Sequence, residues 1–258
     1  MTISESITCL NCNAEVPGQT FLEAHKVCPL CGHHYRMGAY ERLDLLIDAG
    51  SFEEYDAGLY SVNPLDFPDY EEQLARDYAK TGLKSEILTG EAQIGDFRIA
   101  ITISDFGIRG GTMGSVVGEK VTRCIERATA EKFPLIIVSG SGGMRMQEGT
   151  LALMQMSKTA AASVRHAEAG LCYISVMTDP TYGGSTASFA SLAHVILAEP
   201  GARIGFAGPL ATASIQQKLP DNFQKAEFLL EHGMIDRIVE RSQMRALLID
   251  LLDFCVDR

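Results

Sequence analysis

The fold of this chain is decided by the stretch Leu135-Ile136-Ile137-Val138-Ser139-Gly140-Ser141-Gly142-Gly143-Met144-Arg145-Met146-Gln147-Glu148-Gly149. Its first four residues are branched and apolar with no polar alternation, which predicts a strand buried on both faces. A turn of glycine and serine follows, and residues 150–163 are rich in good helix formers. The stretch therefore predicts a strand, a sharp turn and a helix in succession.

The same construction recurs about forty residues further along the chain. A second apolar run, residues 173–177, leads to Gly183-Gly184 and then to a short run, residues 185–190, that is expected to be helical. Paired glycines let the backbone turn sharply, and a helix start leaves N–H groups without partners. Two such corners could aim backbone donors at one negative oxygen, or both could be ordinary turns of a parallel sheet.

The remaining pattern predicts an α/β layer fold, because strands and helices alternate along the chain. A β-hairpin is expected over residues 87–94 and 97–103, and a connector over 51–68. The other expected helices are 40–49 ended by Gly50, 69–80 capped by Asp69 and ended near Gly82, 116–131, 223–231 and 242–255; the other expected strands are 195–199, 203–209 and 234–239.

Length and composition allow one substantial domain with a small appendage. The chain has 258 residues, of which 46% are hydrophobic, and a net charge of −11. An acidic chain is unpromising for nucleic acid as its main partner. With no apolar run long enough for a bilayer and no signal-peptide pattern, we expect a cytoplasmic protein without a membrane partner. Three scattered cysteines are expected to be buried thiols: Cys124, Cys172 and Cys255.

Four other cysteines have the spacing of metal ligands. Cys9 and Cys12 form one pair, and Cys28 and Cys31 form a second pair after fifteen intervening residues. Such pairs place four thiolates around one ion, which predicts a closed structural site for zinc, with iron in a rubredoxin-like site as the alternative. A zinc ribbon of this kind could also bind nucleic acid. Three nearby histidines are expected at the surface or around the site without binding the ion: His25, His33 and His34.

The glycine-rich turns lack the motifs of several common enzyme classes. A dinucleotide-binding pattern starting at Gly140 would need a third glycine where Arg145 stands, and no P-loop is present. Ser141 and Ser185 each lack one glycine of a nucleophile elbow. What remains is a site built mainly of backbone donors, which favours chemistry through an enolate or a tetrahedral oxyanion.

Sequence blocks over nearly the whole chain resemble the β subunit of bacterial acetyl-CoA carboxylase carboxyltransferase. These blocks are the two cysteine pairs with His33-His34-x-Arg36-Met37, Gly110-Gly111-Thr112-Met113-Gly114-Ser115-Val116-Val117-Gly118, Ser141-Gly142-Gly143-x-Arg145-Met146-Gln147-Glu148, Leu153-Met154-Gln155-Met156-x-Lys158-Thr159, Tyr173-Ile174-Ser175-Val176-x-Thr178-Asp179-Pro180-Thr181-x-Gly183-Gly184, Ala198-Glu199-Pro200, Ile204-Gly205-Phe206-Ala207-Gly208-Pro209, and residues 218–233.

The resemblance implies a crotonase-like fold of repeated ββα units behind a zinc ribbon. It implies a ribbon at 1–35, a helical connector at 36–85 and a carboxyltransferase domain at 86–258. The implied reaction moves a carboxyl group from carboxybiotin on a carrier protein to acetyl-CoA, giving malonyl-CoA for fatty acid biosynthesis. Backbone N–H groups at Gly143, Met144, Gly183 and Gly184 are the implied oxyanion donors. The biotin ureido group is the implied base.

The resemblance also implies partners, because related enzymes pair two such domains and this chain has one. These partners are a carboxyltransferase α subunit in an α2β2 assembly, the biotin carboxyl carrier protein and biotin carboxylase. Binding of ATP or another nucleotide comes with the complex as a whole. For Arg145 an ion pair with Glu148 or a neighbour is expected in preference to contact with an anionic substrate or partner group.

A few residues depart from the family pattern: Arg109, Met144, Tyr182 and His194. These departures leave the expected fold unchanged. They keep open two further functions, a carboxyltransferase or decarboxylase subunit for another acyl-CoA in a specialised pathway, and a zinc-ribbon nucleic-acid-binding regulator.

Overall fold

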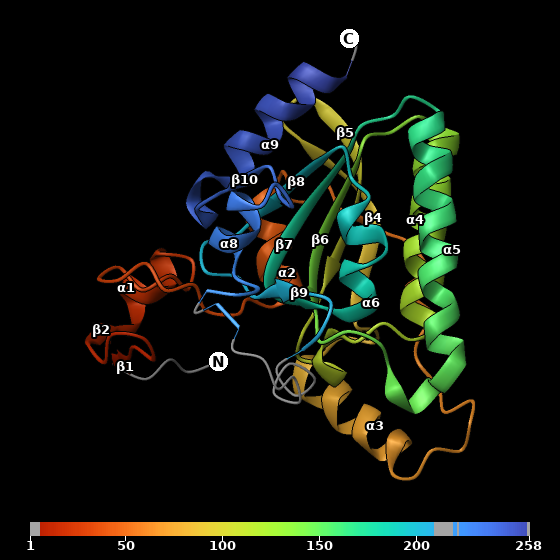
Figure 1. The fold of residues 1–258 in the computed structure, drawn as a ribbon, viewed down its shortest axis with the longest axis horizontal. Helices are drawn as coiled ribbons and strands as arrows, with labels where there is room; N and C mark the ends of the chain where they lie inside the picture. Colours follow the sequence, from red (N-terminus) through yellow and green to blue (C-terminus); the bar gives the residue numbers. More distant parts are fainter. Residues whose placement is uncertain (1–5, 209–218, 221, 257–258) are drawn as a thin grey trace.

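The protein is built around one mixed β-sheet with helices on both faces (Figure 1). The computed structural model describes residues 6–208, 219–220 and 222–256. The strands of the main sheet are β3 (Glu53–Glu54), β4 (Ile87–Ile94), β5 (Phe97–Ser104), β6 (Leu135–Ser141), β7 (Tyr173–Tyr182), β8 (Val195–Ala198), β9 (Ile204–Gly205) and β10 (Arg237–Ile238). Residue 209 of the expected strand 203–209, and residues 218 and 221 of the block at 218–233, lie outside the described residues.

The sheet combines an antiparallel edge with a parallel centre. Its strand order is β10-β8-β7-β6-β5-β4-β3, and β9 pairs with the far end of β7. The hairpin β4–β5 and the pairing of β3 with β4 are antiparallel, whereas β5, β6, β7, β8 and β10 run parallel. The helices between parallel strands are the crossover connections that this arrangement requires. The carboxyl ends of β6 and β7 therefore lie side by side.

Strand β6 shows why its sequence is uniformly apolar. Leu135 and Ile137 belong to the core on one face of the sheet, and Ile136 and Val138 to the core on the other. All four side chains are at most 2% exposed. The expectation of a strand buried on both faces is confirmed, because alternate residues of a strand point to opposite faces.

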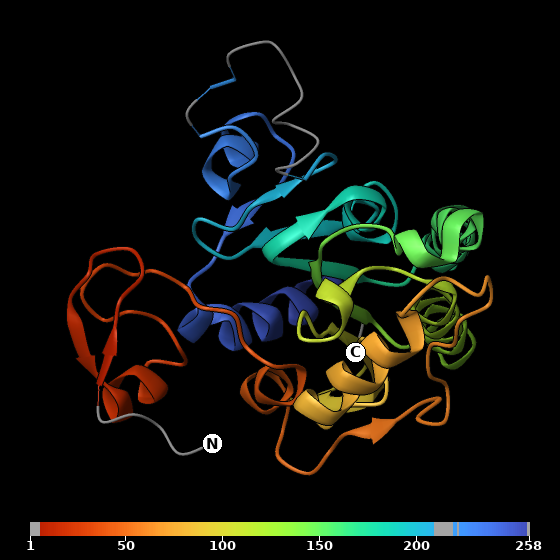
Figure 2. The same cartoon turned by 90° about the horizontal axis from the view of Figure 1, so that it is seen from below.

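Helices cover the two faces unequally. The long helices α4 (Ser115–Glu131) and α5 (Gly149–Glu168) pack together over one face, and α2 (Ala39–Leu46) and α9 (Arg241–Cys255) lie on the other (Figures 1 and 2). Two shorter helices are α3 (Tyr70–Thr81) and α8 (Ala226–Glu231). Among the described residues, no helix is long and apolar enough to cross a membrane.

Two details of the segment before the hairpin differ from expectation. The connector contributes β3 to the sheet edge and so is not a simple loop. Helix α3 ends at Gly82 as expected, but Asp69 makes no capping hydrogen bond because its backbone is left-handed, with φ 60°. An N-cap residue needs extended backbone angles to turn its side chain toward the first N–H groups.

The N-terminal ribbon is a small separate lobe, drawn in red in Figures 1 and 2. It contains β1 (Ser6–Thr8), β2 (Glu15–Pro17) and α1 (Gly18–Glu23) around its own small core. Arg241, the first residue of α9, fastens this lobe to the body by donating to the carbonyl oxygens of His25 at 2.6 Å and Tyr35 at 2.9 Å. The attachment therefore uses ribbon backbone and one buried guanidinium.

The same guanidinium takes part in a buried charge cluster. Glu199 accepts from Arg241 at 2.8 Å and from Arg42 at 2.5 Å, and all three side chains are almost fully buried. Burial alone would raise the pKa of Glu199, but the two guanidinium groups outweigh burial and lower this pKa to about 2. The cluster ties α2, β8 and α9 together at the ribbon side of the sheet.

We predict that Glu199→Gln destabilises the chain by about 3–5 kcal/mol at pH 7, because two buried cations lose their partner. The folded-state pKa of Glu199, about 2, lies below its unfolded value. The stabilisation by the carboxylate is therefore complete above about pH 4.3 and is lost as the pH falls toward 2. Urea unfolding at pH 7 and pH 3 should show the gap to wild type narrowing in acid. The exposed Glu168→Gln is the control, and an equal effect of both variants would contradict the prediction.

Candidate active site

Two backbone corners meet at the carboxyl ends of β6 and β7. A Cβ placed on Gly183 would lie 3.0 Å from the Cα of Gly143 and 3.7 Å from the nitrogen of Met144. Both glycines also have positive φ, 115° at Gly143 and 62° at Gly183. Only glycine combines this backbone conformation with so close an approach. The two paired-glycine turns of the sequence are thus brought into direct contact.

The first corner is held by the turn that precedes α4. The N–H of Met113 donates to the carbonyl of Gly143 at 2.7 Å, and the N–H of Arg145 donates to the carbonyl of Met113 at 2.9 Å. These two bonds fix the backbone on either side of Met144. Among the described residues, no oxygen accepts a hydrogen bond from the Met144 N–H itself. That N–H is therefore a fixed donor without an internal partner.

Two serines connect the corners. The N–H of Gly143 donates to the hydroxyl of Ser141 at 3.1 Å, and the hydroxyl of Ser185 donates to the same oxygen at 3.0 Å. Ser141 and Ser185 are both buried. The Gly143 amide therefore has an internal acceptor, which distinguishes it from the Met144 amide.

The second corner is the start of the one-turn helix α6 (Gly183–Thr186). N–H groups in a first helical turn have no acceptor four residues back within the helix. The side chain of Met144 packs against Gly184, where an added Cβ would also lie 2.8 Å from the sulfur of Met156. Met144 thus supplies a backbone donor and fills space beside the second corner.

The helix after the first corner lies where the sequence predicted it, since α5 begins at Gly149 after a 3₁₀ turn at residues 146–148, whereas the helix after the second corner differs from expectation. After the second pair, the helix starts at Gly183 itself and ends at Thr186, followed by a 3₁₀ turn at Phe189–Ser191. The donors of the first corner are consequently positioned by the bonds to Met113 rather than by a helix start.

A buried charge network lies directly behind the first corner. The guanidinium of Arg145, 1% exposed, donates to Glu86 at 2.8 Å, to the Thr112 carbonyl at 2.9 Å and to the hydroxyl of Tyr70. The Tyr70 hydroxyl donates in turn to Glu148 at 3.0 Å. The expected ion pair of Arg145 is confirmed, and its close partner is Glu86, since the Glu148 carboxylate is 3.9 Å away.

Glu148 extends this network to α4. Its second oxygen accepts from the N–H of Ser115, the first residue of α4, at 2.6 Å. A carboxylate at a helix N-terminus satisfies an unpaired N–H and interacts favourably with the helix dipole. The contacts of Arg145 with Glu86, Tyr70 and Thr112 were not predicted from the sequence, because these partners come from distant segments. The charge network of Arg145 and the first glycine corner together link α3, α4 and β6.

The other residues that depart from the family pattern have structural contacts of their own. Arg109, with φ 45°, pairs with Asp77 at 3.5 Å. The ring of His194 accepts from the N–H of Tyr173 at 3.0 Å. Tyr182 is 6% exposed and directly precedes the second corner.

The four ribbon cysteines form a group that could hold one metal ion. Their sulfur atoms all lie within 4.8 Å of one another, with Cys9 and Cys31 3.7 Å apart and Cys12 and Cys28 3.9 Å apart. Four thiolates in a tetrahedron at the usual zinc–sulfur distance are about 3.8 Å apart. His34 is buried beside the group and lies 3.3 Å from Glu240, whereas His33 packs on Tyr35. The geometry fits a tetrahedral metal site.

The remaining cysteines are only partly as expected. Cys124 and Cys172 are buried, and burial raises the pKa of each thiol to about 12. Cys255 is exposed near the end of α9, so the expectation of a buried thiol is wrong there.

Comparisons with known proteins decide the family. The carboxyl transferase domain matches residues 34–219. The acetyl-CoA carboxylase carboxyl transferase subunit beta of Syntrophomonas wolfei is 51% identical over 247 residues, which cover 95% of this chain and 88% of that protein. The chain belongs to the family of these beta subunits. The homologous subunit of Clostridium novyi is 49% identical over 248 residues, covering 96% of this chain and 86% of its own length.

Solved structures show the same fold. Transcarboxylase 12S, with methylmalonyl-coenzyme A bound, has a TM-score of 0.73 at 23% identity, covering 92% of this chain and 43% of that chain. A malonate decarboxylase hetero-dimer from Pseudomonas has a TM-score of 0.65 at 20% identity, covering 86% and 88%. The expected crotonase-like α/β fold is confirmed. The chain is a subunit of a carboxyl-transferring enzyme. The expectation of ATP or nucleotide binding finds no support, because the matched domain is the carboxyl transferase.

We predict that Arg145→Met lowers the free energy of unfolding by about 3–5 kcal/mol, because Glu86 would remain buried without its cation. Arg165→Met is the matched control. Arg165 is half exposed and pairs with Glu126 at the surface, so its loss should cost less than about 1 kcal/mol. Urea unfolding measures both, and equal losses would show that the Arg145 network does not hold the site.

Proposed function

We propose that the chain is the β subunit of acetyl-CoA carboxylase carboxyltransferase and transfers a carboxyl group from carboxybiotin to acetyl-CoA, giving malonyl-CoA. The observation that best supports this proposal is the contact between the two glycine corners. There the Met144 N–H is fixed beside Gly183 and has no acceptor among the described residues. Such preorganised donors suit an oxygen that gains negative charge during reaction. Acetyl-CoA as the substrate is supported by the names of the acetyl-CoA carboxylase beta subunits of two other bacteria, to which this chain is about half identical in sequence.

The chemistry requires an enolate. Removal of a proton from the acetyl methyl group leaves negative charge on the thioester oxygen, and the methyl carbon then bonds to the carboxyl carbon. Backbone donors at Met144, Gly183 and Gly184 are proposed to surround this oxygen, whereas the N–H of Gly143, also expected as a donor from the sequence, already donates to Ser141. The N–C bond of carboxybiotin on its carrier would break, releasing carbon dioxide as the carboxyl donor, and the ureido nitrogen freed by this cleavage would accept the methyl proton. The protein thus contributes positioning and electrostatic stabilisation rather than a side-chain base.

The chain is proposed to form half of the cleft. An α subunit would complete it in an α2β2 assembly, the biotin carboxyl carrier protein would bring carboxybiotin, and biotin carboxylase would charge the carrier. The four ribbon cysteines are proposed to bind structural zinc, which would stabilise a lobe whose own core is very small. The proposed domain limits remain 1–35, 36–85 and 86–258.

The test of function is reconstitution. With the α subunit and carboxylated biotin carrier, acetyl-CoA should be carboxylated, and the chain alone should show little or no activity. A panel of acyl-CoA thioesters measures kcat/KM for each acyl group. A higher kcat/KM for a longer acyl-CoA, or release of carbon dioxide from malonyl-CoA as the main reaction, would replace the proposed function by one of its two enzymatic alternatives.

We predict that Gly183→Ala lowers kcat of the reconstituted enzyme by about 100-fold, because a methyl group 3.0 Å from the Gly143 Cα would push the corners apart. Gly201→Ala is the matched control. Gly201 has nearly the same φ, 66°, and open space around its Cβ, so it carries the same backbone strain without the contact. If both variants lose activity equally, closeness of the corners is not what the reaction needs.

Metal analysis tests the ribbon. The purified chain should contain one zinc ion per molecule, and Cys28→Ser should lose it because a buried ligand is removed. Cys255→Ser should keep the full zinc content, since Cys255 is remote from the four cysteines in sequence and exposed. Iron in place of zinc, or unchanged zinc in Cys28→Ser, would contradict this assignment.

A further inference from the structure

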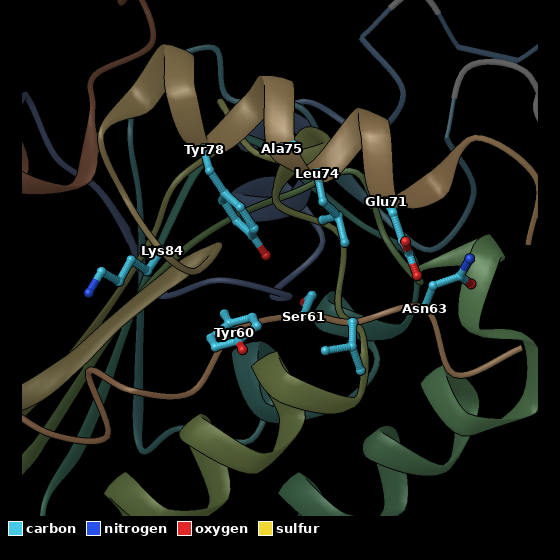
Figure 3. A pocket seen from close by; sticks show the side chains of 9 residues that line it. Tyr60, Ser61, Asn63, Glu71, Leu74, Ala75, Tyr78 and Lys84 are labelled. Atoms are coloured by element: carbon cyan, nitrogen blue, oxygen red, sulfur yellow. The ribbon is translucent and has the colours of Figure 1, made fainter. Parts of the chain in front are cut away.

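A second cavity, distinct from the glycine corners, lies between α3 and the segment at residues 60–63 (Figure 3). Its volume is about 350 Å³, within the range of small-molecule sites. Leu74 and Ala75 of α3 line it from one side and Tyr60 from the other, and Val62 also belongs to its lining. Tyr60 and Val62 are more than half exposed, which leaves apolar surface available to a bound molecule. The walls are therefore suited to an apolar body.

The polar groups of this cavity are arranged unevenly. The hydroxyl of Tyr78 points into the cavity toward Ser61 and is buried, and among the described residues it forms no hydrogen bond of good geometry. Burial raises the pKa of Tyr78 to about 12, so its hydroxyl keeps its proton and can donate. Lys84 is exposed and lies at one end, with its ammonium group directed outward, and it pairs with no carboxylate of the described chain; Glu71 lies at the other end (Figure 3). One end thus offers donors and a positive charge, whereas the other is negative.

We propose that this cavity binds a monocarboxylate with an apolar body. The carboxylate would accept from the Tyr78 hydroxyl and lie toward Lys84, while the apolar body would cover Leu74, Ala75 and Val62. Glu71 disfavours a second carboxylate at the far end, because like charges repel. The charge arrangement therefore selects a molecule with one acidic end.

The floor of the cavity connects to the candidate active site. Ser61 lines the cavity and donates to Glu86 at 3.0 Å, and Glu86 accepts from Arg145 at 2.8 Å. The backbone of Arg145 is the one that, with Met113, fixes the Met144 N–H. A carboxylate in the cavity that competes for the Ser61 hydroxyl would weaken this chain of bonds. Binding is therefore expected to lower kcat, an effect that rests on the proposed function.

Calorimetry with the full chain and octanoate as the probe tests the site itself. Ala75→Phe would fill the cavity and should weaken binding by at least about tenfold. Ala79→Phe, on the same helix but outside the cavity, is the matched control and should bind normally. Lys84→Met should weaken binding by about fivefold, with Lys80→Met as its control, and octanedioate should bind about fivefold more weakly than octanoate.

Each other result has a defined meaning. Equal binding by Ala75→Phe and wild type, or tighter binding of octanedioate, would overturn the site. Loss of α-subunit association in Ala75→Phe would show that the cavity is a subunit contact, which also overturns it. Thermal unfolding of both phenylalanine variants separates these outcomes from misfolding.

The effect on catalysis is measured separately in the reconstituted enzyme. Octanoate should lower kcat at least about threefold in wild type, and Ser61→Ala should bind octanoate but show no such decrease. Binding without any change in wild-type kcat would overturn the connection to the active site. Absence of all transferase activity would instead count against the proposed function, while the calorimetric result would stand unaffected.

Discussion

The close approach of the backbone at Gly143 and Gly183 is the constraint on which the rest of the site depends. A single methyl group at Gly183 would meet the Gly143 Cα at 3.0 Å. The contact is made by main chain on both sides, so donors from two different strand ends reach one small region. Peptide N–H groups held in this way need no rearrangement when charge develops, which is the condition for effective electrostatic stabilisation. The parallel pairing of β6 with β7 supplies the alignment.

Buried charges hold the first corner from behind. Replacing a buried ion pair by apolar residues often costs little stability, so the Arg145–Glu86 pair is not explained by stability alone. The pair instead fixes the orientation of the Arg145 side chain, because its planar guanidinium is bonded to Thr112, Tyr70 and Glu86 at once. Glu148 joins the same network and also receives the first N–H of α4. The network thereby fixes the end of β6, the start of α4 and helix α3 relative to one another.

The sequence predicted the fold better than it predicted the contacts of the site. Local patterns predict strand β6, the hairpin and the long helices. In each of these elements the spacing of apolar residues along the sequence indicates which side chains are buried. Local pattern failed where backbone conformation decided the outcome, as at Asp69, whose left-handed backbone prevents capping, and after the second glycine pair, where the helix starts at Gly183 and ends at Thr186. Glu86 could not be predicted, since its partner Arg145 is 59 residues away. The paired glycines were predictable as turns, but their mutual contact is a property of the assembled sheet.

The attachment of the ribbon has a consequence for how the protein tolerates mutation. Arg241 bonds to the carbonyl oxygens of His25 and Tyr35, and a carbonyl is present whatever side chain occupies the position. Substitutions at these two ribbon positions leave both acceptors in place, whereas a change at Arg241 removes both bonds at once. These two bonds therefore tolerate substitution on the ribbon side and depend on one arginine side chain on the other.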